Sequence, residues 1–141
     1  MIRFAAGTLR TAAIVFVRVA LGAAFLSAVA DRFGIWGEVG DPNVAWGSWD
    51  RFEAYTATLV WYLPAMLVPV AAWTATLAEA LLGAALLIGV KLREVALASG
   101  VLLTIFALSM AAAMGVKAPL DFSVFTAAAA AFYLATESRS G

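Results

Sequence analysis

The sequence predicts an all-α integral membrane protein, a four-helix bundle with an interfacial or re-entrant helix before the second span. Of its 141 residues 65% are hydrophobic and only 13% charged, and the mean hydropathy is +0.97. A soluble domain is roughly half apolar and a quarter charged. A chain this short cannot bury such an excess of apolar surface inside itself. We therefore expect the lipid bilayer to cover it.

Several apolar runs approach the ~20 residues that a membrane-spanning helix needs. We interpret the chain as a single membrane domain, residues 1–141, whose spans cover about 11–30, 70–90, 95–115 and 120–135. The last run is short for a span. The first imitates a cleavable signal peptide, but Arg18 interrupts its apolar core, so we expect it to stay.

Residues 31–63 are expected to form an outer loop followed by the interfacial helix. The run from Tyr55 to Val90 is too long for one span, and Pro64 and Pro69 interrupt it because proline lacks an N–H and clashes with the preceding helical turn. We therefore place the second span after Pro69. The alternative, a separate span over 55–68, would give five spans but is too short. Tryptophans in the loop favour the membrane–water boundary.

Charge near the span ends predicts the orientation. With four spans, both termini and the loop between spans two and three share one side. That side carries Arg3, Arg10, Lys91, Arg93 and Arg139. The opposite side has fewer basic residues and many acidic ones, so the positive-inside rule predicts cytoplasmic termini in a multi-pass protein of a bacterial-type plasma (inner) membrane.

Composition also limits the chemistry. The chain has no cysteine and no histidine, which removes thiol chemistry and the commonest metal ligand and general base. We therefore predict no metal site, and no catalytic residue can be assigned. The net charge of zero gives no basic face for nucleic acid.

Two ionisable residues, Arg18 and Glu79, fall well inside predicted spans. A charge facing lipid costs at least ~2.5–3.5 kcal/mol on insertion scales, so both should face the bundle interior. Counting depth from the outer ends places them within an arginine's reach of each other. We predict a buried Arg18–Glu79 pair, which fixes helix register, binds a polar headgroup such as a quinone carbonyl, or carries a proton.

Two further groups of residues are candidates for packing or function. Small residues favour close helix contacts in membranes, and the predicted packing glycines are Gly22, Gly83, Gly89 and Gly100. A polar cluster at the outer rim, either simply solvated or a binding site, contains Asp31, Arg32, Lys117 and Asp121.

The order of these motifs resembles the DoxX family of small four-helix membrane proteins. The first span carries Arg18-Val-Ala-Leu-Gly-Ala-Ala-Phe25, followed by Arg32, and the second carries Glu79-Ala-Leu-Leu-Gly-Ala-Ala-Leu-Leu-Ile-Gly89. The run from Gly115 to Phe125 is similar to the third-to-fourth connection of one subgroup. The usual glycine near the end of the first span is Val29 here, and the usual lysine is Arg32.

The resemblance implies a DoxX-like inner-membrane subunit associated with an oxidoreductase or a quinone-linked redox process. It would be an accessory subunit rather than a complete enzyme, with a quinone as its cofactor and a protein partner or homo-oligomer in the membrane. One alternative is a structural or assembly subunit of a larger membrane complex without catalytic activity. A weaker alternative is a small-solute transporter, which would need an oligomer to form a pore.

Overall fold

The computed structural model describes residues 2–139, with only the backbone for Ile2 and Phe4, and this part of the chain is helical without strands. The prediction of an all-α fold is thereby confirmed. The elements in chain order are α1 (Ile2–Arg32), α2 (Trp49–Leu59), the 3-10 turn η1 (Ala65–Leu67), α3 (Val68–Ile88), α4 (Leu92–Met114), α5 (Lys117–Asp121) and α6 (Val124–Glu137).

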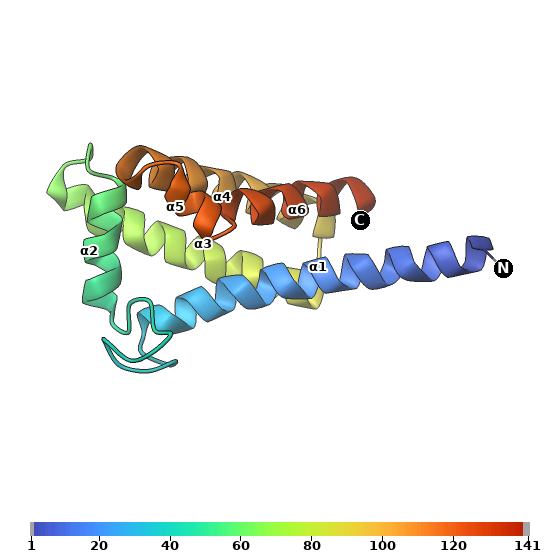
Figure 1. The fold of residues 1–141 in the computed structure, drawn as a ribbon, viewed down its shortest axis with the longest axis horizontal. Helices are drawn as coiled ribbons and strands as arrows, with labels where there is room; N and C mark the ends of the chain where they lie inside the picture. The colour runs from blue at the N-terminus through green and yellow to red at the C-terminus, as the bar shows by residue number, and fades with distance from the viewer. Residues whose placement is uncertain (1, 140–141) are drawn as a thin grey trace.

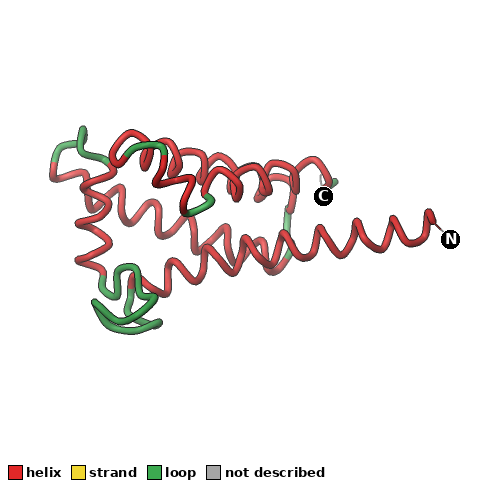
Figure 2. The backbone as a smooth tube through the Cα atoms, in the orientation of Figure 1, coloured by secondary structure: helices red, strands yellow, loops and turns green. Residues whose placement is uncertain are grey.

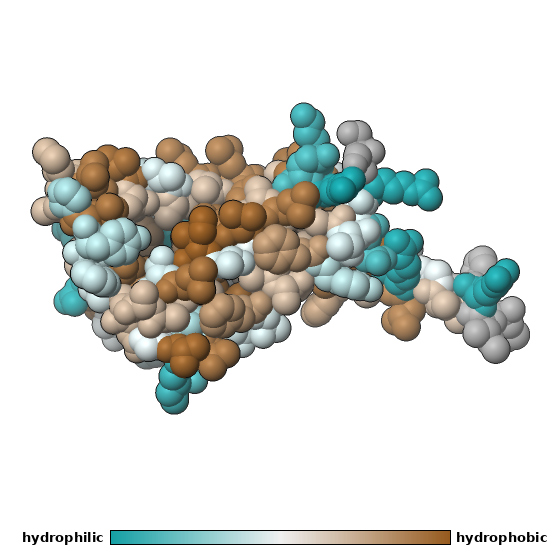
Figure 3. All heavy atoms as spheres, turned by 90° about the horizontal axis from the view of Figure 1, so that it is seen from above, coloured by the Kyte–Doolittle hydropathy of each residue, from teal (hydrophilic) through white to brown (hydrophobic). Residues whose placement is uncertain are grey.

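Three helical segments of the described chain are long and apolar enough to cross a membrane. They cover Ala5–Arg32, Ala65–Ile88 and Leu92–Met114. The central parts of these helices expose large apolar side chains. Figure 3 shows apolar surface along the molecule, and hydrophilic residues gather near the termini. Because no described part of the chain covers these faces, their exposure indicates contact with a lipid bilayer.

The predicted last span, 120–135, differs from the structure. Residues 117–121 form the separate helix α5, and α6 begins only at Val124. The break falls at Ser123, whose φ of 55° is left-handed, a conformation in which a regular α-helix does not continue. The 14 residues of α6 span roughly 21 Å, less than the ~30 Å hydrocarbon core.

The long helices contact one another in the ring order α1, α3, α4, α6 and back to α1. Figure 1 shows these four helices running along the long axis of the molecule. A core of buried apolar residues joins them. Its buried members are Leu21, Phe25, Leu86, Ala96, Leu103, Ala128, Ala131, Leu134 and Ala135.

Both ends of the chain lie at the same end of the molecule, close to the turn between α3 and α4 (Figures 1 and 2). We call it the terminal end, and the opposite end, with the loop of residues 33–48, the loop end. Helix α2 lies across the loop end, steeply inclined to the long helices (Figure 1). It ends at Leu59, before the expected Leu63. Helix α3 begins at Val68 with Pro69 in its first turn, where a missing N–H costs nothing.

Small residues set the closest helix approaches. A Cβ on Gly22 would lie 2.9 Å from the carbonyl oxygen of Gly83, and one on Gly83 would lie 3.1 Å from that of Gly22. At the α4–α6 contact, a Cβ on Gly100 would lie 2.7 Å from the ring of Phe132. Three of the glycines expected to pack helices therefore lie where only a hydrogen fits.

Helix α1 extends beyond the helices that it packs against. Its 31 residues extend roughly 46 Å, and its N-terminal part projects past the other helices (Figures 1 and 2). Arg10 joins this part of α1 to α6, because its Nε donates to Glu137 Oε2 at 2.5 Å. Leu9 and Phe16, in this half of the helix, are 71% and 74% exposed.

Candidate functional site

A buried ion pair joins α1 to α3 near the loop end. The Arg32 guanidinium pairs through Nη2 with Glu79 Oε2, and the side chains are 3% and 5% exposed. Arg32 Nη1 also donates to Thr76 Oγ1 at 2.8 Å, and that hydroxyl donates to the Ala72 carbonyl at 2.8 Å. The pair is thus a small polar network inside helices that are otherwise apolar.

Aromatic side chains cover this pair from α2 and the preceding loop. The Phe52 ring centre lies 3.8 Å from Arg32 Cζ, and the Trp46 ring centre lies 5.4 Å from it. A cation over an aromatic face is worth about 2 kcal/mol or more when water is excluded. The adjoining rings of Trp49 and Trp73 stack at 4.2 Å. This contact holds α2 against α3 and so holds the cover in place.

Asp31, next to Arg32, organises the loop. Its carboxylate accepts backbone N–H groups from Ala45 at 2.9 Å, Trp46 at 2.8 Å and Gly47 at 3.0 Å. A charged acceptor makes such bonds about twice as strong as neutral ones. Gly47 has φ 71°, and a Cβ there would lie 2.6 Å from Val39 N. Two consecutive residues of α1 therefore have different roles. Asp31 holds the loop through its backbone hydrogen bonds, and Arg32 pairs with the buried Glu79.

The expected Arg18–Glu79 pair is wrong, because Glu79 pairs with Arg32. Helices α1 and α3 run antiparallel and cross at Gly22 and Gly83. Arg18 precedes Gly22 by four residues and so lies on the terminal side of the crossing. Glu79 precedes Gly83 by four residues and, because α3 runs the opposite way, lies on the loop side. The charges therefore lie on opposite sides of the crossing, roughly 12 Å apart along the axis. The prediction counted the depth of each residue from the outer end of its span, and this count did not reveal the displacement.

Arg18 lies instead where α3 ends. Its Nη1 would be 2.8 Å from a Cβ on Gly89, which has φ 86° and caps α3 in the left-handed conformation. Gly89 was expected to pack helices, but it terminates α3 and makes room for the guanidinium. A cation at a helix C-terminus is favoured by the helix dipole. Arg18 has no ion-pair or hydrogen-bond partner among residues 2–139.

The outer-rim residues do not form one cluster. Lys117 Nζ pairs with Asp121 at 2.5 Å within α5, and both side chains are more than half exposed. Arg32 turns inward and Asp31 binds the loop. The rim prediction therefore divides into a buried part, Asp31 and Arg32, and a solvated pair on α5.

Sequence reasoning missed the partners that complete the Arg32 site. Thr76 precedes Glu79 by three residues, so both lie on one face of α3, and this spacing was available in the sequence. Phe52 and Trp46 carried no such signal, because their position over Arg32 depends on how α2 folds back across the bundle. Beside Trp46 lies Tyr55, 5.7 Å between ring centres, and burial raises the pKa of its phenol.

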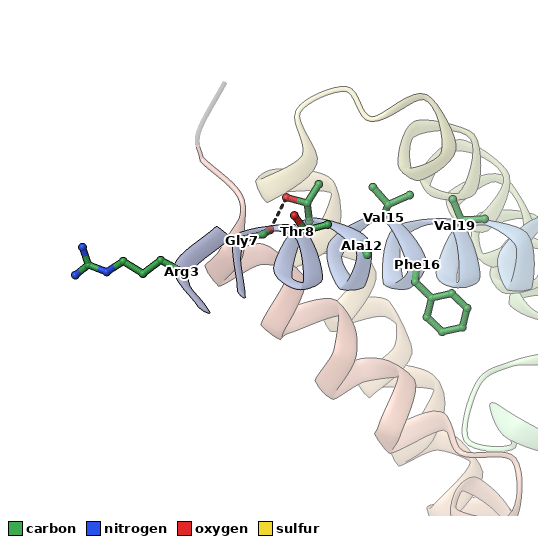
Figure 4. A pocket seen from close by; sticks show the side chains of 8 residues that line it. Arg3, Gly7, Thr8, Ala12, Val15, Phe16 and Val19 are labelled. Carbon is green, nitrogen blue, oxygen red and sulfur yellow. Dashed lines mark hydrogen bonds between the residues drawn. The ribbon is translucent and has the colours of Figure 1, made fainter. Parts of the chain in front are cut away.

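A surface hollow lies elsewhere, along the projecting half of α1. It encloses about 1000 Å³ and is open to the surroundings. Figure 4 shows the side chains that line it, with Thr11 donating to the Gly7 carbonyl at 3.0 Å. The lining residues are Arg3, Gly7, Thr8, Thr11, Ala12, Val15, Phe16 and Val19. Because they all belong to one helix face, this is an open surface for lipid or another helix rather than an enclosed ligand site.

No group of three or more potential metal-binding side chains occurs among residues 2–139. Fold and site together define an all-helical protein with three helices fit to cross a membrane and a buried ion pair between two of them. Comparison of the chain with protein-family models, curated proteins and solved structures finds no match. The resemblance to the DoxX family stays a prediction from the sequence.

Proposed function

We propose that this protein is a DoxX-like accessory subunit of a membrane oxidoreductase, and that its Arg32–Glu79 site binds the carbonyl end of a quinone. In this proposal α6 completes a four-helix bundle in a bacterial-type inner membrane, with both termini in the cytoplasm. The redox association comes from the family resemblance. The polar network under α2 supplies the binding chemistry.

One observation carries the proposal. Arg32 Nε is buried and has no hydrogen-bond partner among the described residues, although its side chain is only 3% exposed. Leaving a buried donor unsatisfied costs about 1–3 kcal/mol, and more for a charged group. A quinone carbonyl is a neutral acceptor on an apolar ring. It would satisfy this donor without disturbing the charge balance of the Arg32–Glu79 pair.

The surroundings suit such a ligand. Phe52 and Trp46 offer aromatic faces beside the guanidinium, and quinone rings stack on such faces. The site lies near the loop end of the long helices, where the ring of an isoprenoid quinone meets the membrane boundary. Arg32 would orient the ring, while a partner subunit would supply the electrons.

The test must separate ligand binding from folding. Removing one member of a buried pair destabilises the fold by 3–5 kcal/mol, whereas replacing both by apolar residues of similar volume is often neutral. The double variant Arg32→Met/Glu79→Leu is therefore expected to fold, and Arg51→Gln, an exposed change on α2, is the matched control. Each protein is purified from membranes in mild detergent, and its extractable quinone is measured.

Wild type and Arg51→Gln should retain quinone, and the folded double variant should lose it. An equal quinone content in the double variant would contradict the proposal. So would a wild-type protein that still contains no quinone after exposure to excess ubiquinone or menaquinone.

A structural or assembly role is the second candidate, favoured by the projecting half of α1. This segment exposes the apolar residues Leu9 and Phe16 and the small residues Gly7 and Ala12, and close helix contacts in membranes use such faces. The expected partner is a transmembrane helix of another subunit. Mild-detergent purification should recover it, and Gly7→Leu should release it without changing the quinone content.

A further inference from the structure

We propose that Arg18 and Lys91 form a binding site for the phosphate of an anionic phospholipid at the terminal end of the molecule. The site lies where Arg18 of α1 contacts Gly89, in the turn that joins α3 to α4. It is separate from the Arg32–Glu79 site, so either can exist without the other.

Arg18 is a cation that has no counter-charge among residues 2–139. The nearest interior acid, Glu79, is taken by Arg32, and no described residue forms an ion pair or hydrogen bond with Arg18. Its Nε is buried as well as unpartnered. An arginine inside an otherwise apolar span is costly unless it reaches a polar group. From its depth the guanidinium can extend only toward the nearer headgroup layer.

Gly89 leaves room for the Arg18 guanidinium at the turn between α3 and α4. The Arg18 Nη1 lies where a side chain on Gly89 would begin. Lys91 follows two residues later, is exposed, and has φ 42° at the start of α4. Arg18 on α1 thus contacts the turn to which Lys91 belongs, and two cations there would suit a phosphodiester that accepts several charge-assisted hydrogen bonds.

Apolar surface flanks these charges and identifies a lipid rather than a free anion. Ile88 and Val90, on either side of Gly89, are 71% and 51% exposed. On α1, Val15 and Val19 are 44% and 43% exposed. A soluble phosphate would leave this surface uncovered, whereas the acyl chains of a phospholipid would cover it.

The charge of the terminal end complements an anionic membrane surface. Hydrophilic side chains gather there in Figure 3. The described basic residues of this end are Arg3, Arg10, Arg18, Lys91, Arg93 and Arg139, against the acids Glu94 and Glu137. Basic groups close to an anionic leaflet each contribute about 1 kcal/mol of attraction. The general excess would draw anionic lipid to this end, and Arg18 and Lys91 would bind the phosphate of one molecule.

The experiment measures lipid affinity by native mass spectrometry of the full chain in mild detergent. The probes are phosphatidylglycerol, phosphatidylcholine with the same acyl chains, and inorganic phosphate. The variants are Arg18→Gln, Arg18→Lys and Lys91→Gln, with Arg51→Gln at the loop end as the matched control. Lys91 is exposed, so its variant is informative even if Arg18→Gln does not fold.

Wild type should bind phosphatidylglycerol more tightly than phosphatidylcholine. Arg18→Gln and Lys91→Gln should each weaken phosphatidylglycerol binding by about fivefold or more, while Arg18→Lys and Arg51→Gln retain it. Unchanged binding in Lys91→Gln, or in folded Arg18→Gln, would overturn the proposal. An equal loss in Arg51→Gln would do so too, because general charge would then explain binding. Displacement of the lipid by millimolar phosphate would show a free-anion site instead.

Discussion

Helix α1 places two arginines near α3, Arg32 toward the loop end and Arg18 toward the terminal end, and the surroundings of their guanidinium groups differ. Arg32, at the loop end, has an acid, a hydroxyl and aromatic faces around its guanidinium. Arg18, at the terminal end, has only the space over Gly89. The difference teaches that a charge inside a membrane helix need not signal an interior partner. It can instead depend on what lies outside the chain.

The strongest test of this difference removes one charge at each end. Glu79→Ala leaves Arg32 buried without its acid, so we expect a loss of about 3–5 kcal/mol in stability. Arg18→Leu removes a charge that has no partner in the chain, so the stability in detergent should change by less than about 1 kcal/mol. Thermal unfolding of both variants in one detergent measures the contrast. A similar loss in both would show that Arg18 has an interior role.

The helix crossing that separates the two arginines is tested by a matched glycine pair. Gly22→Ala places a Cβ 2.9 Å from the Gly83 carbonyl oxygen and from Leu87 Cγ, and such overpacking costs about 1–3 kcal/mol. Gly7→Ala meets nothing within 4 Å and should be neutral or slightly stabilising, since alanine favours helix. Unfolding temperatures that fall equally in both variants would contradict this crossing.

The aromatic cover distinguishes the loop end further. Phe52→Leu keeps an apolar side chain but removes the ring face over Arg32, so we expect a loss of roughly 1–2 kcal/mol. In the Arg32→Met/Glu79→Leu background the same change should cost less, because no cation remains beneath the ring. A double-mutant cycle measures the coupling, and additive effects would rule out the cation–π contribution.

The smallest effect is expected at the solvated pair on α5. Lys117 and Asp121 are 84% and 54% exposed, and such pairs contribute about 0.3–0.5 kcal/mol. Lys117→Ala should therefore leave both stability and quinone content unchanged. A clear loss of quinone in this variant would show that Lys117, at the outer rim, contributes to quinone binding.

Particular residues show how far the sequence could lead. The apolar runs and Pro69 located α3 and α4 to within about three residues at each end, because covering by lipid and the missing proline N–H act locally. Helix α1 begins at Ile2, nine residues before the span expected at 11–30. The pairing of Glu79 could not be read in this way. Arg18 and Arg32 were both available, and only the antiparallel crossing at Gly22 and Gly83 decides which one lies on the same side of the crossing as the acid.

The sequence by itself determined that the chain is helical, that long stretches of it suit a bilayer, and that charges lie within those stretches. Composition and local backbone chemistry are enough for these conclusions. The tertiary structure alone decided that Arg32 neutralises Glu79, that α2 covers the pair with Phe52, and that Arg18 stays without a partner. Contacts between helices depend on their register and crossing, and these are set by packing across residues that lie far apart in the chain.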